Sequence, residues 1–284
     1  MAAASPPDPP FVRLGPAGAP TPLVIAVPHA GRCYPDELLA ASRLPRSALE
    51  TIEDRFADLL VADAVRDGAV AIVARVARAY VDLNRDPREI DPAIVRDAGA
   101  LDTRSSDKVA GGLGAVPSRI AAGGAVWRRP LAAAEIARRL ALVHRPYHDA
   151  VADALDAAAA RHGVALLIDC HSMPSLGPGG ARIVLGDLHG RSAALRFTVA
   201  ALAAVKMCGQ PCARNRPYAG GHSLERHGDP HRHRHALQVE VDRALYLDPG
   251  CRDPGADLAS ARTLVATIAA ALVAEAGALA QAAE

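Results

Sequence analysis

Four polar residues with metal-binding or nucleophilic side chains come directly after an apolar run in the sequence. The run Val164–Ile168 is typical of a buried strand, and it is followed by Asp169, Cys170, His171 and Ser172. A second histidine, His29, follows the apolar run "VIAVP" in the same way. Because open α/β sheets bind ligands at the carboxyl ends of their strands, the two histidines are candidate metal ligands.

The motif "IEDRF" offers an acidic third ligand. A catalytic zinc ion typically takes three protein ligands and leaves one position open for water or substrate. Glu53 and Asp54 of this motif lie inside a segment with helical spacing. Acidic residues also suit the first turn of a helix, where they interact favourably with its dipole. The motif alone therefore leaves a metal-binding and a solvent-exposed interpretation open.

Glu240 lies within the apolar segment "ALQVEVDRALY". Alternation along a strand places Gln238 and Glu240 on one face and the neighbouring valines on the other. A carboxylate in such an apolar strand needs a partner or a chemical role. The partner would be an arginine in a buried ion pair, and the role would be that of a general base.

Asn84 and Arg85 close the segment "YVDLNR". An arginine beside an amide is well suited to bind a substrate carboxylate, because the guanidinium group donates hydrogen bonds in a planar fork. The alternative is structural: Asp82, a few residues earlier, is a possible ion-pair partner for Arg85.

Cys170 raises the separate possibility of a thiol nucleophile next to His171. Adjacent residues of a strand point to opposite faces, so His171 is poorly placed to activate its neighbour. The same alternation puts Asp169 on the side of His171, where it would orient the imidazole of a metal ligand.

Strands and helices alternate along the chain. Strands are predicted at 23–27, 69–76, 79–86, 164–168, 181–187 and 236–248. Helices are predicted at 45–68, 131–162, 193–206 and near the C-terminus, with Pro146 expected to break or kink the second. This order indicates one α/β domain, 21–284, with a mostly parallel sheet covered on both faces. Residues 1–20 are expected to be loose, and 97–130 to form a long excursion.

Composition excludes several classes of protein. Among the 284 residues half are hydrophobic but only 3% aromatic, which favours a core of Ala, Val, Leu and Ile. The net charge of +1 argues against a nucleic-acid-binding protein with a broad basic face. Five irregularly spaced cysteines and the absence of a signal-like N-terminus predict reduced thiols in the cytoplasm. The apolar stretch 264–280 contains Glu275 and is predicted to pack in the protein and not to span a membrane.

Seven motifs occur in the order found in the N-formylglutamate amidohydrolase family, which this chain resembles over about residues 22–250. They are "VPHAGRCYP", "ED", "VDLNRDPREIDP", "LLIDCHSMPS", "RIVLGDLHGRS", "NRPYAGGHS…HGDP" and "HALQVEVDRALYLD". The family is similar in fold to the zinc carboxypeptidases and aspartoacylases. The resemblance implies a three-layer α/β/α domain with a mostly parallel mixed sheet and a catalytic zinc ion.

The resemblance also implies roles for individual residues. His29 and His171 resemble the histidine ligands, and the acid would be Asp54, with Glu53 as the alternative, because related sequences keep an aspartate there. Asn84 and Arg85 resemble the carboxylate-binding pair, and Glu240 resembles the general base. Arg32 stands where the carboxypeptidases have a glutamate ligand three residues after the histidine.

The activity implied by the resemblance is metal-dependent hydrolysis of N-formyl-L-glutamate, or a closely related N-acyl amino acid, to the free acid and amine. The alternatives are the same chemistry on another N-acyl amino acid or formyl amide, and a non-catalytic relative that binds an amino acid or a metal. A dicarboxylate substrate calls for a second cation, for which the candidates are Arg88, Arg104 and Arg182. His222 stands where the family often has a tyrosine, which leaves the side-chain preference open.

Overall fold

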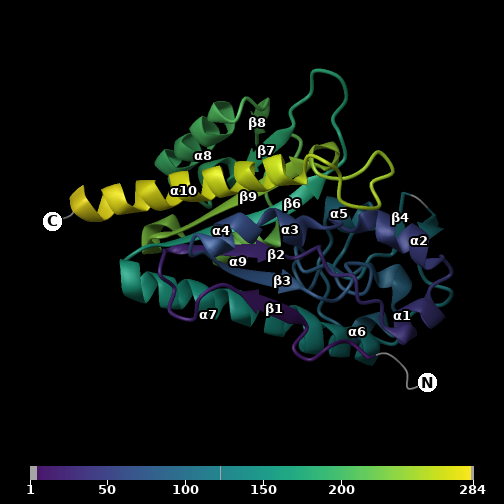
Figure 1. Cartoon of the computed structure of the whole chain (residues 1–284). Coiled ribbons are helices and arrows are strands. Elements are labelled where there is room, and N and C mark those ends of the chain that lie inside the picture. The colour runs from purple at the N-terminus through teal and green to yellow at the C-terminus, as the bar shows by residue number, and fades with distance from the viewer. Residues whose placement is uncertain (1–4, 122, 283–284) are drawn as a thin grey trace. The chain divides into compact units, whose positions relative to one another are not determined.

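The computed structural model of the chain describes residues 5–121 and 123–282 (Figure 1). The contacts between Cα atoms divide these residues into two compact units. Unit 1 comprises the described residues up to Val12, Pro28–Glu53 and Ala74–Asp149. Unit 2 comprises Arg13–Val27, Asp54–Val73 and the described residues from Ala150 onward.

Unit 2 contains most of a seven-stranded sheet in the described part of the chain, with strand order β1-β3-β2-β6-β9-β7-β8. The strands are β1 (Phe11–Leu14), β2 (Leu23–Val27), β3 (Val70–Ala74), β6 (Ala165–Met173), β7 (Ile183–Gly186), β8 (Cys212–Arg214) and β9 (Arg234–Asp242). The pairs β2/β3, β2/β6, β6/β9 and β7/β8 are parallel, whereas β7 is antiparallel to β9. The sheet is therefore mixed and mostly parallel, as predicted.

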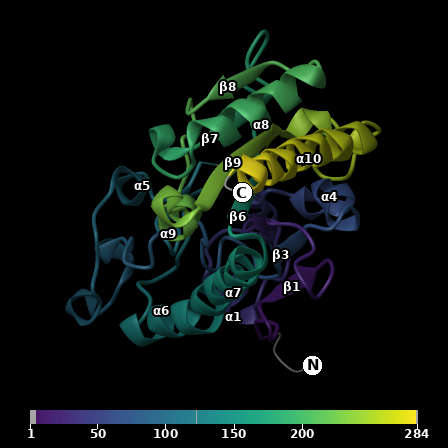
Figure 2. The ribbon, with the colours of Figure 1, turned by 90° about the vertical axis from the view of Figure 1, so that its left-hand side faces the viewer.

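Helices cover both faces of this sheet, which explains why its central strands are apolar runs. The helices are α3 (Ala57–Leu60), α4 (Ala62–Arg66), α7 (Arg145–His162), α8 (Leu195–Met207), α9 (His222–His227) and α10 (Leu258–Ala282), with short turns η5 (Leu188–Gly190), η6 (Pro230–Arg232) and η7 (Arg243–Leu245). Figure 2 shows α4, α8 and α10 on one side of the sheet, and α7 and α9 on the other. Every residue of β2 and β6 is buried, as expected of a strand covered on both faces. This arrangement confirms the predicted α/β class.

The C-terminal helix α10 is long and apolar enough to cross a membrane by length and composition. A helix that packs in the core of a protein passes the same test. Here α10 contacts α3, α4 and α8 as well as strands β2 and β6. Its apolar side chains therefore pack within unit 2, in agreement with the prediction of a packing helix.

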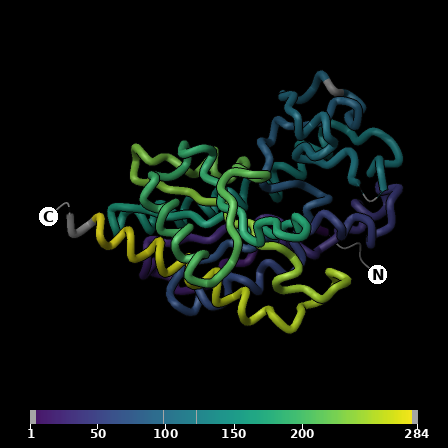
Figure 3. The backbone as a smooth tube through the Cα atoms, turned by 90° about the horizontal axis from the view of Figure 1, so that it is seen from above, coloured from purple at the N-terminus to yellow at the C-terminus, as the bar shows by residue number. Residues whose placement is uncertain are grey.

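Unit 1 contains short elements joined by long irregular segments. They are α1 (Asp36–Ala41), α2 (Arg46–Leu49), η1 (Glu50–Ile52), η2 (Pro92–Ile94), η3 (Ala98–Ala100), α5 (Asp107–Ala110), β4 (Arg119–Ile120), β5 (Gly124–Ala125), α6 (Ala133–Arg139) and the π turn η4 (Leu140–His144). The described residues of the predicted excursion, 97–121 and 123–130, are visible in Figure 3 as a run of loops with little regular structure. Helix α7 begins in unit 1 and continues into unit 2.

Two local predictions are corrected by the structure, and a third, at Pro146, agrees with it. The helix expected at 45–68 is interrupted between Ile52 and Ala57, because Glu53 is extended and Phe56 has φ 59°. The strand expected at 79–86 does not form, and this segment is a series of turns. At Pro146, where a break or kink was expected, the α-helix is interrupted: since proline cannot donate a backbone hydrogen bond, the preceding turn widens into the π turn η4 before α7 begins.

The N-terminal segment 1–20, which was expected to be loose, contributes the edge strand β1. Its sequence Phe-Val-Arg-Leu has the β-branched and aromatic residues that favour strands, and an edge strand needs only one partner. The short run lies between Pro- and Gly-rich residues, which hid it from analysis by composition. The placement of residues 1–4 lies outside the described part of the chain.

Candidate active site

The carboxyl ends of β6 and β9 bring two of the predicted functional residues together in unit 2. These strands are parallel neighbours, and their register pairs Asp169 with Gln238 and His171 with Glu240. Residues paired in this way share a face of the sheet, so His171 and Glu240 lie side by side on it. Cys170 points to the opposite face, as the alternation predicts. Both His171 and Glu240 are buried.

His171 is held between two carboxylates. Its Nδ1 lies 2.8 Å from Oδ2 of Asp54, and its Nε2 lies 2.9 Å from Oδ2 of Asp169. Burial lowers the pKa of His171, but the charges and hydrogen bonds of Asp169 and Asp54 outweigh it and hold the pKa well above its usual value. The pocket around Nδ1 therefore favours positive charge, which a proton or a metal ion supplies.

The two acids of the "ED" motif have different environments. Asp54 contacts His171 through one oxygen, and its other oxygen, Oδ1, lies 3.3 Å from Nη2 of Arg243. Glu53 accepts a hydrogen bond from the hydroxyl of Tyr34 within unit 1. The break in the predicted helix separates the two side chains, and the one beside His171 is that of Asp54.

His29, in unit 1, is oriented in the same manner as His171. Its Nε2 lies 2.7 Å from Oδ1 of Asp82, whose Oδ2 accepts a hydrogen bond from Arg78 at 2.8 Å. Burial opposes ionisation of Asp82, but the charges of Arg78 and His29 hold its pKa well below the usual value. In both candidate histidines, Nε2 therefore contacts a buried aspartate, and Nδ1 points away from that aspartate. A carboxylate on one ring nitrogen is the usual support of a histidine metal ligand.

Arg85 does not form the ion pair with Asp82 that was considered as its structural role. Its Nε donates to the carbonyl oxygen of Leu113 at 2.9 Å, and its Nη1 donates to that of Asn84 at 2.6 Å. No acidic side chain within residues 5–121 and 123–282 forms an ion pair with it. Asp82 instead accepts the backbone N–H of Asn84 at 2.9 Å, which shapes the turn that carries both residues. The guanidinium group is held by carbonyl oxygens, and its charge acts on Asp82 without a direct hydrogen bond: together with Arg78 and His29 it lowers the pKa of that carboxyl group.

Comparison with known proteins identifies the family. The sequence of residues 21–247 matches the family described as N-formylglutamate amidohydrolase. The chain belongs to the N-formylglutamate amidohydrolase family. It is 30% identical over 237 residues to the N-formylglutamate deformylase of Pseudomonas putida, and 31% identical over 237 residues to that of Pseudomonas aeruginosa; each match covers 80% of this chain and 82% of the relative.

A solved N-formylglutamate amidohydrolase from Ralstonia eutropha JMP134 has a similar fold. The two structures align with a TM-score of 0.85 at 30% identity, covering 93% of this chain and 97% of the other. The N-formylglutamate amidohydrolases are hydrolases, and the substrate of the family is the small molecule N-formylglutamate. The resemblance deduced from the seven motifs is confirmed.

The arginines considered for a second carboxylate are paired with acids in this family member. Arg88 and Arg104 contact Oδ2 of Asp86 at 2.8 and 3.3 Å, and Arg182 contacts Asp242 at 2.8 Å. Sequence analysis missed a further cation, Arg243, whose Nε lies 3.2 Å from Oγ of Ser172 and whose Nη2 lies beside Asp54. Its position three residues after Glu240, at the end of β9, was the available signal.

Cys170→Ala should retain the hydrolase activity of the wild-type chain, because the thiol is buried on the face opposite His171. Burial, with the nearby charges of Asp54 and Asp169, raises the pKa of Cys170, so the thiolate needed for nucleophilic attack is disfavoured. Turnover of both proteins should be measured before and after treatment with iodoacetamide. Loss of activity in a folded Cys170→Ala protein would restore the cysteine-nucleophile hypothesis.

Proposed function

We propose that this protein hydrolyses N-formyl-L-glutamate to formate and L-glutamate with the help of one divalent metal ion, zinc. Membership of the N-formylglutamate amidohydrolase family supports the substrate. The observation that carries the mechanism is His171, held between Asp54 and Asp169 and paired across the sheet with Glu240. This arrangement combines a metal ligand, its orienting acid and a neighbouring base.

His29, Asp54 and His171 would hold the metal. Two imidazole nitrogens and one carboxylate oxygen are a common ligand set of catalytic zinc, and all three residues are buried. The connectivity of the chain supports this set, because β2 and β6 are parallel neighbours with Ala26 opposite Asp169, and each histidine follows within three residues. When bound, zinc polarises a carbonyl group and lowers the pKa of water.

Glu240 would act as the general base. Its Oε1 accepts a hydrogen bond from Nε2 of Gln238 at 2.9 Å, which fixes the carboxylate in the strand. Glu240 would take a proton from the attacking water as oxygen bonds to the formyl carbon. It would then give that proton to the amine nitrogen as the C–N bond breaks, so that formate and glutamate leave and the carboxylate is restored.

Asn84 and Arg85 would bind a carboxylate of the substrate. The hydrogen bonds of the Arg85 guanidinium group go to the carbonyl oxygens of Leu113 and Asn84 and not to an acid, so no carboxylate of the described residues is hydrogen-bonded to it. A charge-assisted hydrogen bond from a guanidinium group suits a carboxylate better than a neutral group. This contact would favour an N-acyl amino acid over a simple amide.

The proposal is tested by measuring kcat/KM of wild type and Arg85→Ala, with zinc, for N-formylglutamate, its α-amide, its γ-amide and N-acetylglutamate. Wild type should prefer N-formylglutamate. Arg85→Ala should lower kcat/KM for it by about 10- to 150-fold, the equivalent of roughly 1.5–3 kcal/mol for a charge-assisted hydrogen bond.

The two amides are the internal control in this experiment. The amide that lacks the carboxylate bound by Arg85 should be a poor substrate for wild type and should be little affected by the substitution. Equal losses for all four substrates would assign Arg85 a structural role. A better rate with N-acetylglutamate than with the formyl compound would identify a different N-acyl amino acid as the substrate.

A further inference from the structure

Two buried histidines of unit 1 bracket the turn that carries Asn84 and Arg85. Nε2 of His148 lies 2.7 Å from the carbonyl oxygen of Leu83, and Nε2 of His144 lies 2.9 Å from that of Arg85. A carbonyl oxygen only accepts hydrogen bonds, so both rings donate their Nε2–H. The two bonds hold the backbone immediately before and at the carboxylate-binding pair.

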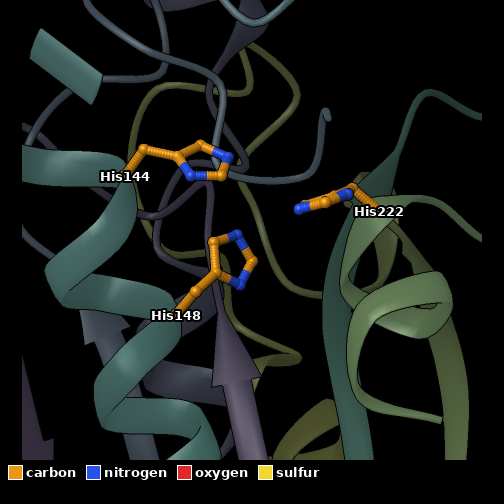
Figure 4. Close-up of side chains that lie close together, drawn as sticks. All are labelled: His144, His148 and His222. Atoms are coloured by element: carbon orange, nitrogen blue, oxygen red, sulfur yellow. The ribbon is translucent and has the colours of Figure 1, made fainter. Parts of the chain in front are cut away.

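The helix places these two rings next to each other. His144 ends the π turn η4, and His148 lies one turn later in α7. Their ring centroids are 4.6 Å apart, and Figure 4 shows both rings projecting from the same side of the helix. Figure 4 also labels His222, the first residue of α9 in unit 2. Residues spaced four apart on a helix share a face, which makes the pair a single rigid support.

The turn needs this support because it has no strand to hold it. Residues 79–86 form turns and irregular backbone, and the peptide groups of Leu83 and Asn84 are in a buried part of unit 1. A buried carbonyl oxygen without a donor is costly, and the histidines supply the donor. The two hydrogen bonds thereby fix the orientation of the Asn84–Arg85 backbone and of the guanidinium group that it carries.

We propose that His144 and His148 are positioning residues for substrate binding: through the carbonyl oxygens of Arg85 and Leu83 they orient the Asn84–Arg85 pair toward the substrate carboxylate. The proposal rests on the proposed function, in which Arg85 binds that carboxylate. It assigns to the two histidines a role in affinity for the acidic substrate, and none in the bond-breaking step.

The test compares His148→Leu, which removes the donor, with His148→Gln, whose amide nitrogen replaces it, and makes the same pair of changes at His144. The Leu variants should raise KM for N-formylglutamate by about fivefold to tenfold, the value of one hydrogen bond, with kcat nearly unchanged. The Gln variants should recover most of this loss. Calorimetric titration with L-glutamate should show the same weakening without turnover.

His162→Leu is the matched control, because His162 is on the same helix and its Nε2 lies 2.8 Å from another backbone carbonyl oxygen, that of Ala19. It should leave KM unchanged. In the Arg85→Ala background, His148→Leu should have a smaller effect on KM than in wild type, because the charged member of the pair that it positions is already gone.

Three outcomes would overturn the inference while leaving the proposed function intact. They are an unchanged KM in both Leu variants, an equal loss in the Arg85→Ala background, and a fall in kcat that Gln does not restore. A wild-type protein that neither hydrolyses N-formylglutamate nor binds glutamate would overturn the proposed function, and with it this inference.

Discussion

Glu240→Gln is expected to reduce turnover of N-formylglutamate by about 10²- to 10⁴-fold, the usual contribution of a general base. The amide has nearly the shape of the carboxylate but cannot take the proton from the attacking water. Because the amide oxygen introduced by the substitution can still accept the hydrogen bond that Gln238 donates, the substitution should preserve the fold. Turnover, the melting temperature and the zinc content should be measured on the same preparation.

Glu225→Gln is the control for this substitution, since Glu225 is exposed on α9 in the same unit. It should change neither turnover nor stability. If Glu240→Gln keeps turnover within a few-fold of wild type, Glu240 is a structural carboxylate and the base is another group. If turnover falls together with the zinc content, the substitution has disturbed the metal ligands and the base assignment lacks support.

His171→Ala should abolish stoichiometric zinc binding. The substitution removes one ligand of the proposed set, and with it the ring that contacts the carboxylates of both Asp54 and Asp169. Asp169→Asn should have a smaller effect, a loss of about 10- to 100-fold in zinc affinity, because it alters only the support of the ligand ring. Zinc content after dialysis and zinc affinity in a chelator-buffered titration test this order.

Substitutions of the two acids of the "ED" motif test, in the same experiment, which of them binds zinc. Asp54→Asn should weaken zinc binding, whereas Glu53→Gln, which alters the partner of Tyr34, should not. His231→Ala, at an exposed position of unit 2, controls for the loss of a histidine elsewhere. Undiminished zinc in His171→Ala would rule out this residue as a ligand, and loss of zinc in Glu53→Gln alone would exchange the two acids.

Local sequence patterns were sufficient to predict part of the fold and part of the candidate site. The uninterrupted apolar run before Asp169 predicts a strand buried on both faces, and β6 is such a strand. Alternation along that strand predicts that Asp169 and His171 share a side and that Cys170 faces away, because side chains of adjacent strand residues point in opposite directions. The order of the motifs along the chain then led to the family, which the comparisons confirm.

The pairing of strands that lie far apart in the chain could not be predicted from the sequence. The register that sets His171 beside Glu240 joins strands whose positions in the chain are far apart, and periodicity within each strand carries no information about its neighbour. The helix is interrupted between Ile52 and Ala57 by the extended Glu53 and the left-handed Phe56, which a helical pattern does not reveal. Tertiary packing overrode the local preference at that point.

The partners of the charged residues were also decided by packing. Local sequence suggested Asp82 for Arg85, but in the fold Asp82 contacts His29 and Arg78, and Arg85 turns to backbone carbonyl oxygens. His144 and His148 have the spacing of helical neighbours, but nothing near them in the chain indicates that their hydrogen bonds reach Leu83 and Arg85. A hydrogen bond depends on where two atoms meet in three dimensions, and residues about 60 positions apart meet only when the chain folds.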